Sequence, residues 1–194
     1  MTAAQGECDG PVRRLRVLED KEALHGLLVR GWRALDRKDW RTWIECWAED
    51  AVLEFGPWGE TRGREAIRAR VEEAEAPFPS MQHHILNTHF EVDGDRATGI
   101  GYMWFVAVTG EAARSAPYSM GGPYDWEFRR GGDGGWLLTR QRLGVWWTAG
   151  EDSAPAGGRS ALRRSRWRAG RRSRSPCDPR QWVYFPSTPR TRNR

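Results

Sequence analysis

Apolar residues in the first third of the chain recur with the spacing of α-helices. From Leu18 onward, one apolar stripe recurs at intervals of three and four: Leu24, Leu27, Leu28, Gly31, Trp32 and Leu35. After the polar segment DRKD, a second short helix is predicted, with Trp40, Trp43, Ile44 and Trp47 on one side. The segment GREAIRARVEEAEAPFP predicts a third, exposed helix that ends at its prolines.

Other segments have the pattern of β-strands, one of them before the third predicted helix and the rest after it. DAVLEFGPWGE predicts one strand that ends in a Gly-Pro turn. Aromatic and β-branched residues, separated by Asp-Gly or Gly-rich turns, predict antiparallel strands at 81–92, 95–109, 122–130 and 135–149. Strands of this length suit a strongly bent sheet that wraps around a cavity, with the helices closing one side. The fold class predicted is therefore α+β.

Composition divides the chain into three parts. Residues 1–16 are expected to be a flexible lead-in, 17–150 a folded domain, and 151–194 a disordered tail rich in Arg, Ser and Pro. The tail holds twelve Arg and three acidic residues, a balance of +9, whereas the rest holds 19 basic and 23 acidic residues, a balance of −4. A nucleic-acid partner would rest on the tail alone and is not expected, because a poorly constrained extension has the same composition.

Several classes of protein are not expected. No apolar run approaches the ~18 residues of a membrane span, and the N-terminus lacks the apolar segment of a signal peptide. A cytoplasmic protein without a membrane partner is the default expectation. The three cysteines are widely scattered, which matches neither a disulfide framework nor a zinc motif.

Three of the four histidines gather in the segment SMQHHILNTHFEVDGD. On a strand, His83 and His84 point to opposite faces, and His83 and His89 lie roughly 20 Å apart. A shared metal ion is therefore not expected.

One face of this predicted strand combines apolar and polar groups. It carries Met81, His83, Ile85, Asn87 and His89, whereas Phe90 and Val92 fall on the other face. Apolar walls with a few polar groups are typical of a small-molecule pocket. The alternative is a structural histidine at position 83, and a one-residue bulge would exchange the two faces.

Several segments together resemble a known family. WRALDRKDWRTWIECWAEDAVLEF, then GREAI, then MQHHILNTHFEVDGDRAT and later YDWEFRRGGDGGWLLTRQRLGVWWTAG resemble the SnoaL-like branch of the nuclear transport factor 2-like superfamily. The resemblance covers about residues 18–149. It implies a cone of curved antiparallel sheet, capped by N-terminal helices, that encloses a pocket. Dimers through the open sheet face are common in this superfamily, so a homodimer is expected.

The same resemblance implies site residues. In scytalone dehydratase, a member of the superfamily, an aspartate at a helix end and a histidine on a strand reach into the pocket. They match Asp36 of ALDRKDW and His83 of MQHHI. Two departures argue against scytalone dehydration itself: Leu35 replaces a tyrosine, and GYMWFVAVT lacks a second histidine.

The position of Asp36 fits a catalytic role. It follows Trp32 by four residues, so it borders the apolar face of its helix and would be desolvated unless paired. A facing histidine would hold one tautomer and could move a proton near neutral pH. A helix-ending role for Asp36 in water is the alternative.

Two functions remain open at this stage. The first is a lyase, cyclase or isomerase that needs no cofactor or metal and acts on a small apolar cyclic substrate through Asp36 and His83. The second is a carrier that binds such a ligand without chemistry. The candidate ligand-binding residues are Trp32, Ile85, Asn87, Tyr102, Trp104 and Tyr124.

Overall fold

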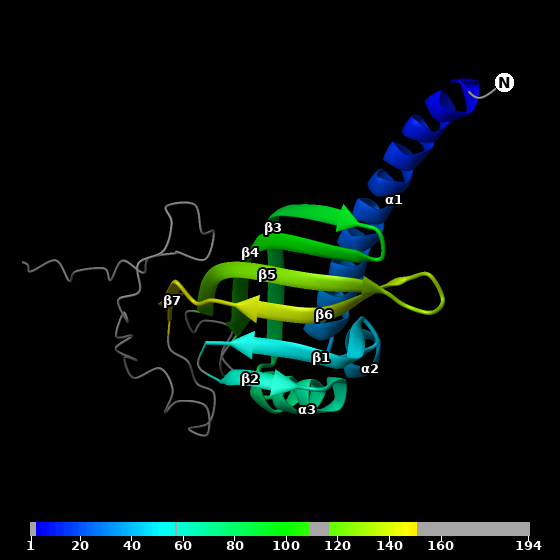
Figure 1. The fold of residues 1–194 in the computed structure, drawn as a ribbon. Coiled ribbons are helices and arrows are strands. Elements are labelled where there is room, and N and C mark those ends of the chain that lie inside the picture. The colour runs from blue at the N-terminus through cyan, green and yellow to red at the C-terminus, as the bar shows by residue number, and fades with distance from the viewer. Residues whose placement is uncertain (1–2, 57, 109–116, 151–194) are drawn as a thin grey trace, which may run out of the picture. The chain divides into compact units, whose positions relative to one another are not determined.

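A computed structural model describes residues 3–56, 58–108 and 117–150; the predicted tail lies outside this part. Within these described residues, three helices and seven strands follow in the order α1 (Ala3–Asp36), α2 (Trp40–Ile44), β1 (Trp47–Phe55), β2 (Gly59–Arg62), α3 (Arg64–Glu75), β3 (Ser80–Asp93), β4 (Arg96–Val108), β5 (Tyr118–Arg130), β6 (Trp136–Leu143) and β7 (Trp147–Ala149). Helices precede the main run of strands, which confirms the α+β class (Figure 1).

The strands form one curved, unclosed sheet in the order β2-β1-β6-β5-β4-β3, with β7 paired to β5. Neighbours are antiparallel except β1 and β6, which are parallel. The long hairpins expected around Asp-Gly and Gly-rich turns are confirmed, since β3, β4 and β5 have 13 or 14 residues each. The parallel junction was not predicted, because five elements (β2, α3, β3, β4 and β5) separate β1 from β6 in the sequence.

The first helix is longer than the apolar stripe predicts. It begins at Ala3 and contains Pro11, so residues 3–16 of the expected flexible lead-in are helical. Side chains from 11 to 16 are exposed, whereas Leu24, Leu28 and Trp32 are buried. Among the side chains of α1 from residue 10 onward, which the structure describes, the buried stripe lies in the second half of the helix and packs against β3 and β6.

A side chain on the sheet holds α1 in place. The Arg130 guanidinium at the end of β5 donates to both carboxylate oxygens of Asp20, at 3.0 and 3.1 Å. The indole N–H of Trp136 donates to the same carboxylate at 3.1 Å, and the Arg130 guanidinium lies over the Trp136 ring. These contacts fix the position at which α1 meets the sheet, and therefore the position of Asp36, the last residue of α1.

A bulge in β3 exchanges the faces of that strand. Its register against β4 shifts between Leu86 and His89, and Asn87 has a φ of 53°. Before the bulge, Met81 and His83 point inward; after it, Phe90 and Val92 do. The unbroken alternation predicted for this strand, with Phe90 opposite His83, is therefore wrong beyond Leu86, because one extra residue inverts the period of two.

Glycines on the inner face of β4 let aromatic rings lie against its backbone. A Cβ at Gly99 would meet the Phe90 ring at 2.8 Å, and one at Gly101 would meet the Trp126 ring at 2.8 Å. Trp126 is itself fixed, because its indole N–H donates to Gln141 at 3.0 Å and both side chains are buried. The missing side chains of β4 therefore make room for the aromatic core.

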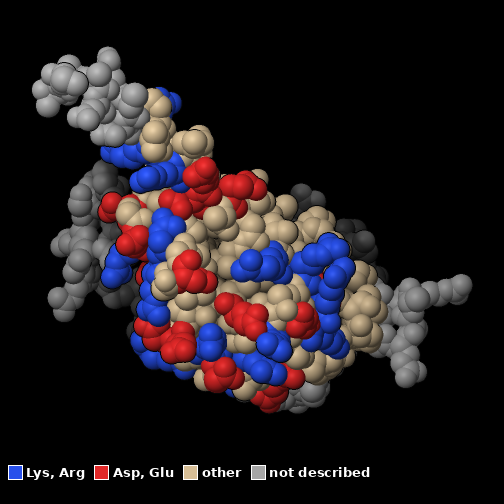
Figure 2. Space-filling model, turned by 90° about the vertical axis from the view of Figure 1, so that its right-hand side faces the viewer, with Lys and Arg blue, Asp and Glu red and all other residues tan. Residues whose placement is uncertain are grey.

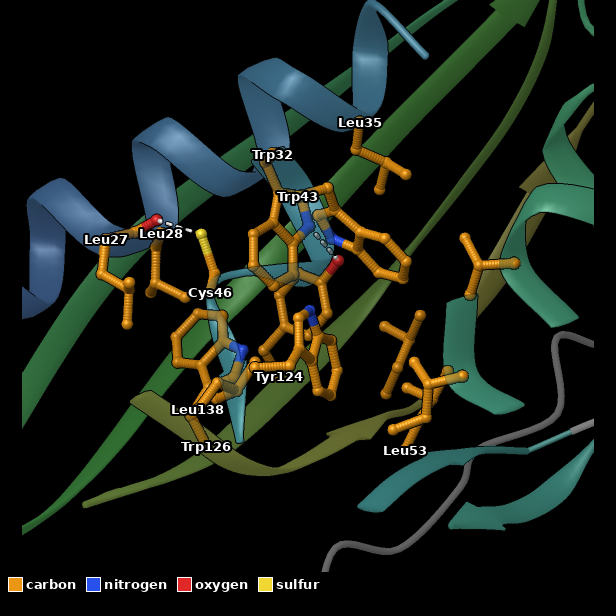
Figure 3. Packing of buried hydrophobic residues seen from close by; sticks show 14 of the residues in the cluster. Leu27, Leu28, Trp32, Leu35, Trp43, Cys46, Leu53, Tyr124, Trp126 and Leu138 are labelled. Carbon is orange, nitrogen blue, oxygen red and sulfur yellow. Dashed lines mark hydrogen bonds between the residues drawn. The ribbon is translucent and has the colours of Figure 1, made fainter. Parts of the chain in front are cut away.

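Tryptophan dominates this core. Trp43, Trp47 and Trp126 are among its largest fully buried side chains, and Trp43 meets Trp47 edge to face. Figure 3 shows Trp32, Trp43 and Tyr124 close together between α1 and the sheet.

The surface carries both signs of charge. On the face shown in Figure 2, basic and acidic side chains are interspersed. Ion pairs join different strands of the sheet, such as Arg140 of β6 with Glu54 of β1 at 2.8 Å and Arg129 of β5 with Asp50 of β1 at 2.8 Å. None of the described helices has the length and apolar character that a membrane crossing requires.

Candidate active site

Asp36 and His83 lie in direct contact. Asp36 is the last residue of α1, and His83 lies near the start of β3. The Asp36 Oδ1 atom lies 2.7 Å from His83 Nδ1, and the backbone N–H of His83 donates to both carboxylate oxygens, at 3.0 and 3.1 Å. An ionised carboxylate only accepts hydrogen bonds, so the Nδ1 atom that faces Asp36 carries a proton. The hydrogen bonds from the backbone N–H of His83 hold the carboxylate in place for this contact.

A second carboxyl group faces the other ring nitrogen. Glu75 Oε1 lies 3.6 Å from His83 Nε2. The His83 side chain is 4% exposed and that of Glu75 is 15% exposed, so the contact is shielded from water. Glu75 Oε2 is buried and has no hydrogen-bond partner in the described part of the chain. The site is thus an imidazole between two carboxyl groups.

Sequence reasoning missed Glu75, although a signal was present. Ile67 and Val71 are the buried residues of α3, and Glu75 follows Val71 by four. Glu75 therefore extends the apolar stripe of α3, just as Asp36 extends that of α1. Because α3 contains several other glutamates, Glu75 did not stand out as a candidate site residue.

Both carboxyl groups stand at the C-terminal ends of their helices. The partial negative charge of a helix C-terminus disfavours an acidic side chain and favours a cation. A protonated His83 supplies that cation to both ends.

The surroundings change the pKa of His83 in opposite directions. Burial lowers it, but the charge of Glu75 and the hydrogen bonds to Asp36 and Glu75 outweigh burial, so the pKa rises from 6.5 to about 9. The imidazole is therefore mainly protonated at neutral pH.

Tyr124 and Trp32 form a buried polar contact beside this group. The indole N–H of Trp32 donates to the Tyr124 hydroxyl at 3.0 Å (Figure 3). Burial is the main cause that raises the pKa of Tyr124 above its ordinary value, and the charges of Glu75 and Asp36 act in the same direction. Tyr124 thus stays a neutral phenol within the electrostatic reach of both carboxylates.

The structure brings together part of the predicted set. Trp32 and Tyr124 are buried near Asp36 and His83, and Ile85 packs against the core on the face of β3 that carries His83. Phe105, which sequence reasoning did not select, lies opposite His83 on β4 with its ring 4.7 Å from the imidazole.

Three predicted residues lie elsewhere. Asn87 is exposed at the β3 bulge, while Tyr102 and Trp104 are 38% and 48% exposed on the outer face of β4. Their assignment to the pocket is wrong. For Tyr102 and Trp104 the reason is that the side chains of β4 that point inward are those of Met103 and Phe105.

The described residues contain no group of three or more His, Cys, Asp and Glu side chains suited to hold a metal ion. Asp36 and Glu75 cannot share an ion with His83, because they contact opposite nitrogens of the ring. His84 and His89 do not join them: His84 packs against Trp104, and His89 is exposed.

Solved structures share this fold. A proposed aromatic ring hydroxylase of Novosphingobium aromaticivorans is 24% identical over 69% of this chain and 94% of its own, with a TM-score of 0.61. A proposed scytalone dehydratase of the same organism is 18% identical over 75% and 92%, with a TM-score of 0.61. A hexachlorocyclohexane dehydrochlorinase, LinA type 3 of Novosphingobium barchaimii, is 19% identical over 72% and 95%, with a TM-score of 0.62.

No curated protein sequence matches the chain. The model of the SnoaL-like domain, however, matches residues 16–142, which is well over half of the chain. With the curved sheet and the helices that precede it, this match shows that the chain belongs to the SnoaL-like family.

Proposed function

We propose that the protein is an acid–base enzyme, a lyase, cyclase or isomerase that acts on a small apolar cyclic substrate. The observation that carries this proposal is the 2.7 Å contact between Asp36 and the deeply buried His83. Asp36 occupies Nδ1, so proton transfer to or from a substrate uses Nε2. Such chemistry needs only side chains that the site already contains.

The neighbours of the pair favour a flat, apolar ligand. Phe105, Trp32 and Tyr124 supply aromatic surface, and the Tyr124 hydroxyl accepts a hydrogen bond from the Trp32 indole N–H. A phenol held in its protonated form can donate a hydrogen bond to an oxygen that gains negative charge in the reaction. In this proposal Tyr124 has that role, and the aromatic rings orient the substrate.

Turnover of defined compounds tests the proposal. Scytalone and hexachlorocyclohexane are suitable first substrates, because the similar structures include proteins described as acting on them. Loss of water or hydrogen chloride is followed by mass spectrometry. We expect His83→Gln to reduce turnover at least about 100-fold, whereas His84→Gln, on the outer face, leaves it unchanged. Undiminished turnover by His83→Gln would rule out the Asp36–His83 pair.

A carrier without chemistry is the second candidate. It is favoured by Leu35, where the dehydratase has a tyrosine, and by the close approach of Glu75 to Nε2, the nitrogen that a substrate needs. Quenching of the intrinsic tryptophan fluorescence reports binding of the same compounds. Binding that leaves each compound chemically intact would favour the carrier over the enzyme.

We also propose a homodimer through the outer face of the sheet. Large exposed apolar side chains gather there and form what we call the outer aromatic face: Leu86, Ile100, Tyr102, Trp104, Trp146 and Trp147. Pairing of β3 with β4 places Leu86 beside Tyr102, and the Tyr102 ring lies 5.6 Å from that of Trp146. Contiguous apolar surface of this kind is typical of a protein interface.

A further inference from the structure

We propose that Glu75 keeps His83 protonated on both ring nitrogens, so that His83 enters the reaction as a proton donor and not as a base. The geometry carries this inference, since a carboxylate oxygen faces each nitrogen: Asp36 Oδ1 at 2.7 Å from Nδ1 and Glu75 Oε1 at 3.6 Å from Nε2. For its catalytic meaning, the inference rests on the proposed function.

The argument begins with what each atom can do. An ionised carboxylate only accepts hydrogen bonds, and a neutral imidazole has one N–H and one lone pair. With Asp36 on the N–H at Nδ1, a neutral ring would turn its lone pair toward Glu75 Oε1, and the two acceptors would repel each other. A ring with two N–H groups removes this repulsion and matches both neighbours.

The other groups around the ring do not outweigh the preference of the two carboxylates for a protonated imidazole. From β4, Phe105 contributes an uncharged ring, and from β5, Tyr124 contributes a neutral phenol. From the loop after α1, the Lys38 ammonium donates to the Ala76 carbonyl oxygen. The C-terminal ends of α1 and α3 add partial negative charge. The charges of Glu75 and Asp36 raise the pKa of His83 against the effect of its burial.

Glu75 is therefore a positioning residue that acts through His83. A protonated imidazole can donate the Nε2 proton to a leaving hydroxyl oxygen or halide, which departs as water or hydrogen chloride, and the neutral Nε2 then takes up the proton that the adjacent carbon loses, which restores the protonated ring. It cannot abstract a proton from carbon until it has lost one. The substrate class that follows is a compound whose reacting group needs protonation.

Nitrogen NMR of the imidazole rings tests the inference without any substrate. The full chain is labelled with nitrogen-15, and His83 is assigned by comparison with His83→Gln, because the chain has four histidines. We expect both His83 nitrogens to be protonated at pH 7, with a midpoint near 9. In Glu75→Gln, which keeps the side-chain shape, the midpoint should fall by about one to three pH units.

Glu72→Gln is the matched control. Glu72 lies on the same helix, is 41% exposed and pairs with Arg68, so its loss should leave the His83 midpoint unchanged. A neutral His83 at pH 7 in the unmodified protein would overturn the inference even if Glu75→Gln did not fold. An unchanged midpoint in a folded Glu75→Gln would also overturn it.

The two proposals fail in different experiments. The protonation state is read without turnover, so a lack of activity on scytalone and hexachlorocyclohexane leaves the NMR result decisive for Glu75. Conversely, a neutral His83 would leave the Asp36–His83 pair available as a base.

Discussion

The side-chain ammonium of Lys38 donates a hydrogen bond of 2.7 Å to the carbonyl oxygen of Ala76, the C-cap residue of α3. Lys38 lies two residues beyond Asp36, and Ala76 directly follows Glu75. One cation thus ties together the two chain segments that deliver the carboxyl groups to His83, and it lies at a helix C-terminus, where positive charge is stabilising.

We expect Lys38→Ala to loosen the Glu75–His83 contact, because the end of α3 loses its link to the loop after α1. The His83 midpoint, measured by NMR, should fall by less than it does in Glu75→Gln. The free energy of unfolding should fall by at most about 1 kcal/mol, since the hydrogen bond is exposed. Arg37→Ala, at the exposed neighbouring position, is the control, and an equal change in both variants would contradict this role.

Asp36→Asn should weaken both the site and the fold. The amide is uncharged, and it cannot match a carboxylate that accepts from both the backbone and the ring of His83. We expect a loss of about 1–3 kcal/mol in the free energy of unfolding, measured with urea, because a buried donor loses its partner. Turnover should fall at least about 100-fold.

The control for this variant is Asp93→Asn, at the exposed end of β3. It removes the same charge from the protein without touching His83. Similar losses of stability in both variants would show that net charge, and not the contact with His83, is responsible.

Stability should depend on pH through His83. Its pKa in the folded protein is raised from 6.5 to about 9, so the folded state binds its proton more tightly than the unfolded state does. The resulting stabilisation is fully present below about pH 6.5 and is lost as the pH rises through about 9. Its upper size is roughly 3 kcal/mol.

Urea unfolding between pH 6 and 10 measures this dependence. The difference in unfolding free energy between the unmodified protein and His83→Gln isolates the contribution of His83 from other titrating groups. We expect this difference to shrink as the pH rises. A constant difference would show that the proton on His83 does not stabilise the fold.

Gly101→Ala should destabilise the sheet. The new Cβ would lie 2.8 Å from the Trp126 ring and 3.2 Å from the Leu86 carbonyl oxygen. Trp126 is 1% exposed and hydrogen-bonded to Gln141, so it cannot move aside easily. We expect a loss of about 1–3 kcal/mol on thermal or urea unfolding. Gly132→Ala, where a Cβ meets nothing within 4 Å, should change stability far less.

Trp104→Glu tests the proposed homodimer. Trp104 is 48% exposed at the centre of the outer aromatic face, next to His84 on β3. A carboxylate there would be buried without a partner in a dimer but solvated in a monomer. We expect sedimentation to show a dimer for the unmodified protein and a monomer for the variant. A monomeric unmodified protein would contradict the proposal.

The resemblance to scytalone dehydratase selected Asp36, and the periodicity of α1 agreed with that selection. The distance of four residues from Trp32 placed Asp36 beside the buried stripe, and the structure puts it against His83. The same rule, applied to Ile67 and Val71, would have selected Glu75. A helix repeats every 3.6 residues regardless of its surroundings, so the side on which a residue lies is encoded locally.

The faces of the strands were predicted less well. For β4, alternation separated Tyr102 and Trp104 from Met103 and Phe105 correctly, but aromatic character suggested the wrong set for the pocket. Which of two apolar faces meets the helices depends on the whole sheet. In β3, the bulge at Asn87 inverted the pattern; Asn tolerates the positive φ found there, but an Asn within a strand pattern does not by itself specify a bulge.

The sequence by itself determined the α+β class, the helical stripes and the hairpins, because these follow from local periodicity and turn residues, and its resemblance to the SnoaL-like family supplied the candidates Asp36 and His83. Only the tertiary structure decided that Glu75 faces the second nitrogen of His83, that β1 runs parallel to β6, and which face of β4 is buried. These features join segments far apart in the chain, and their positions are set by packing around a shared core, which no local pattern records.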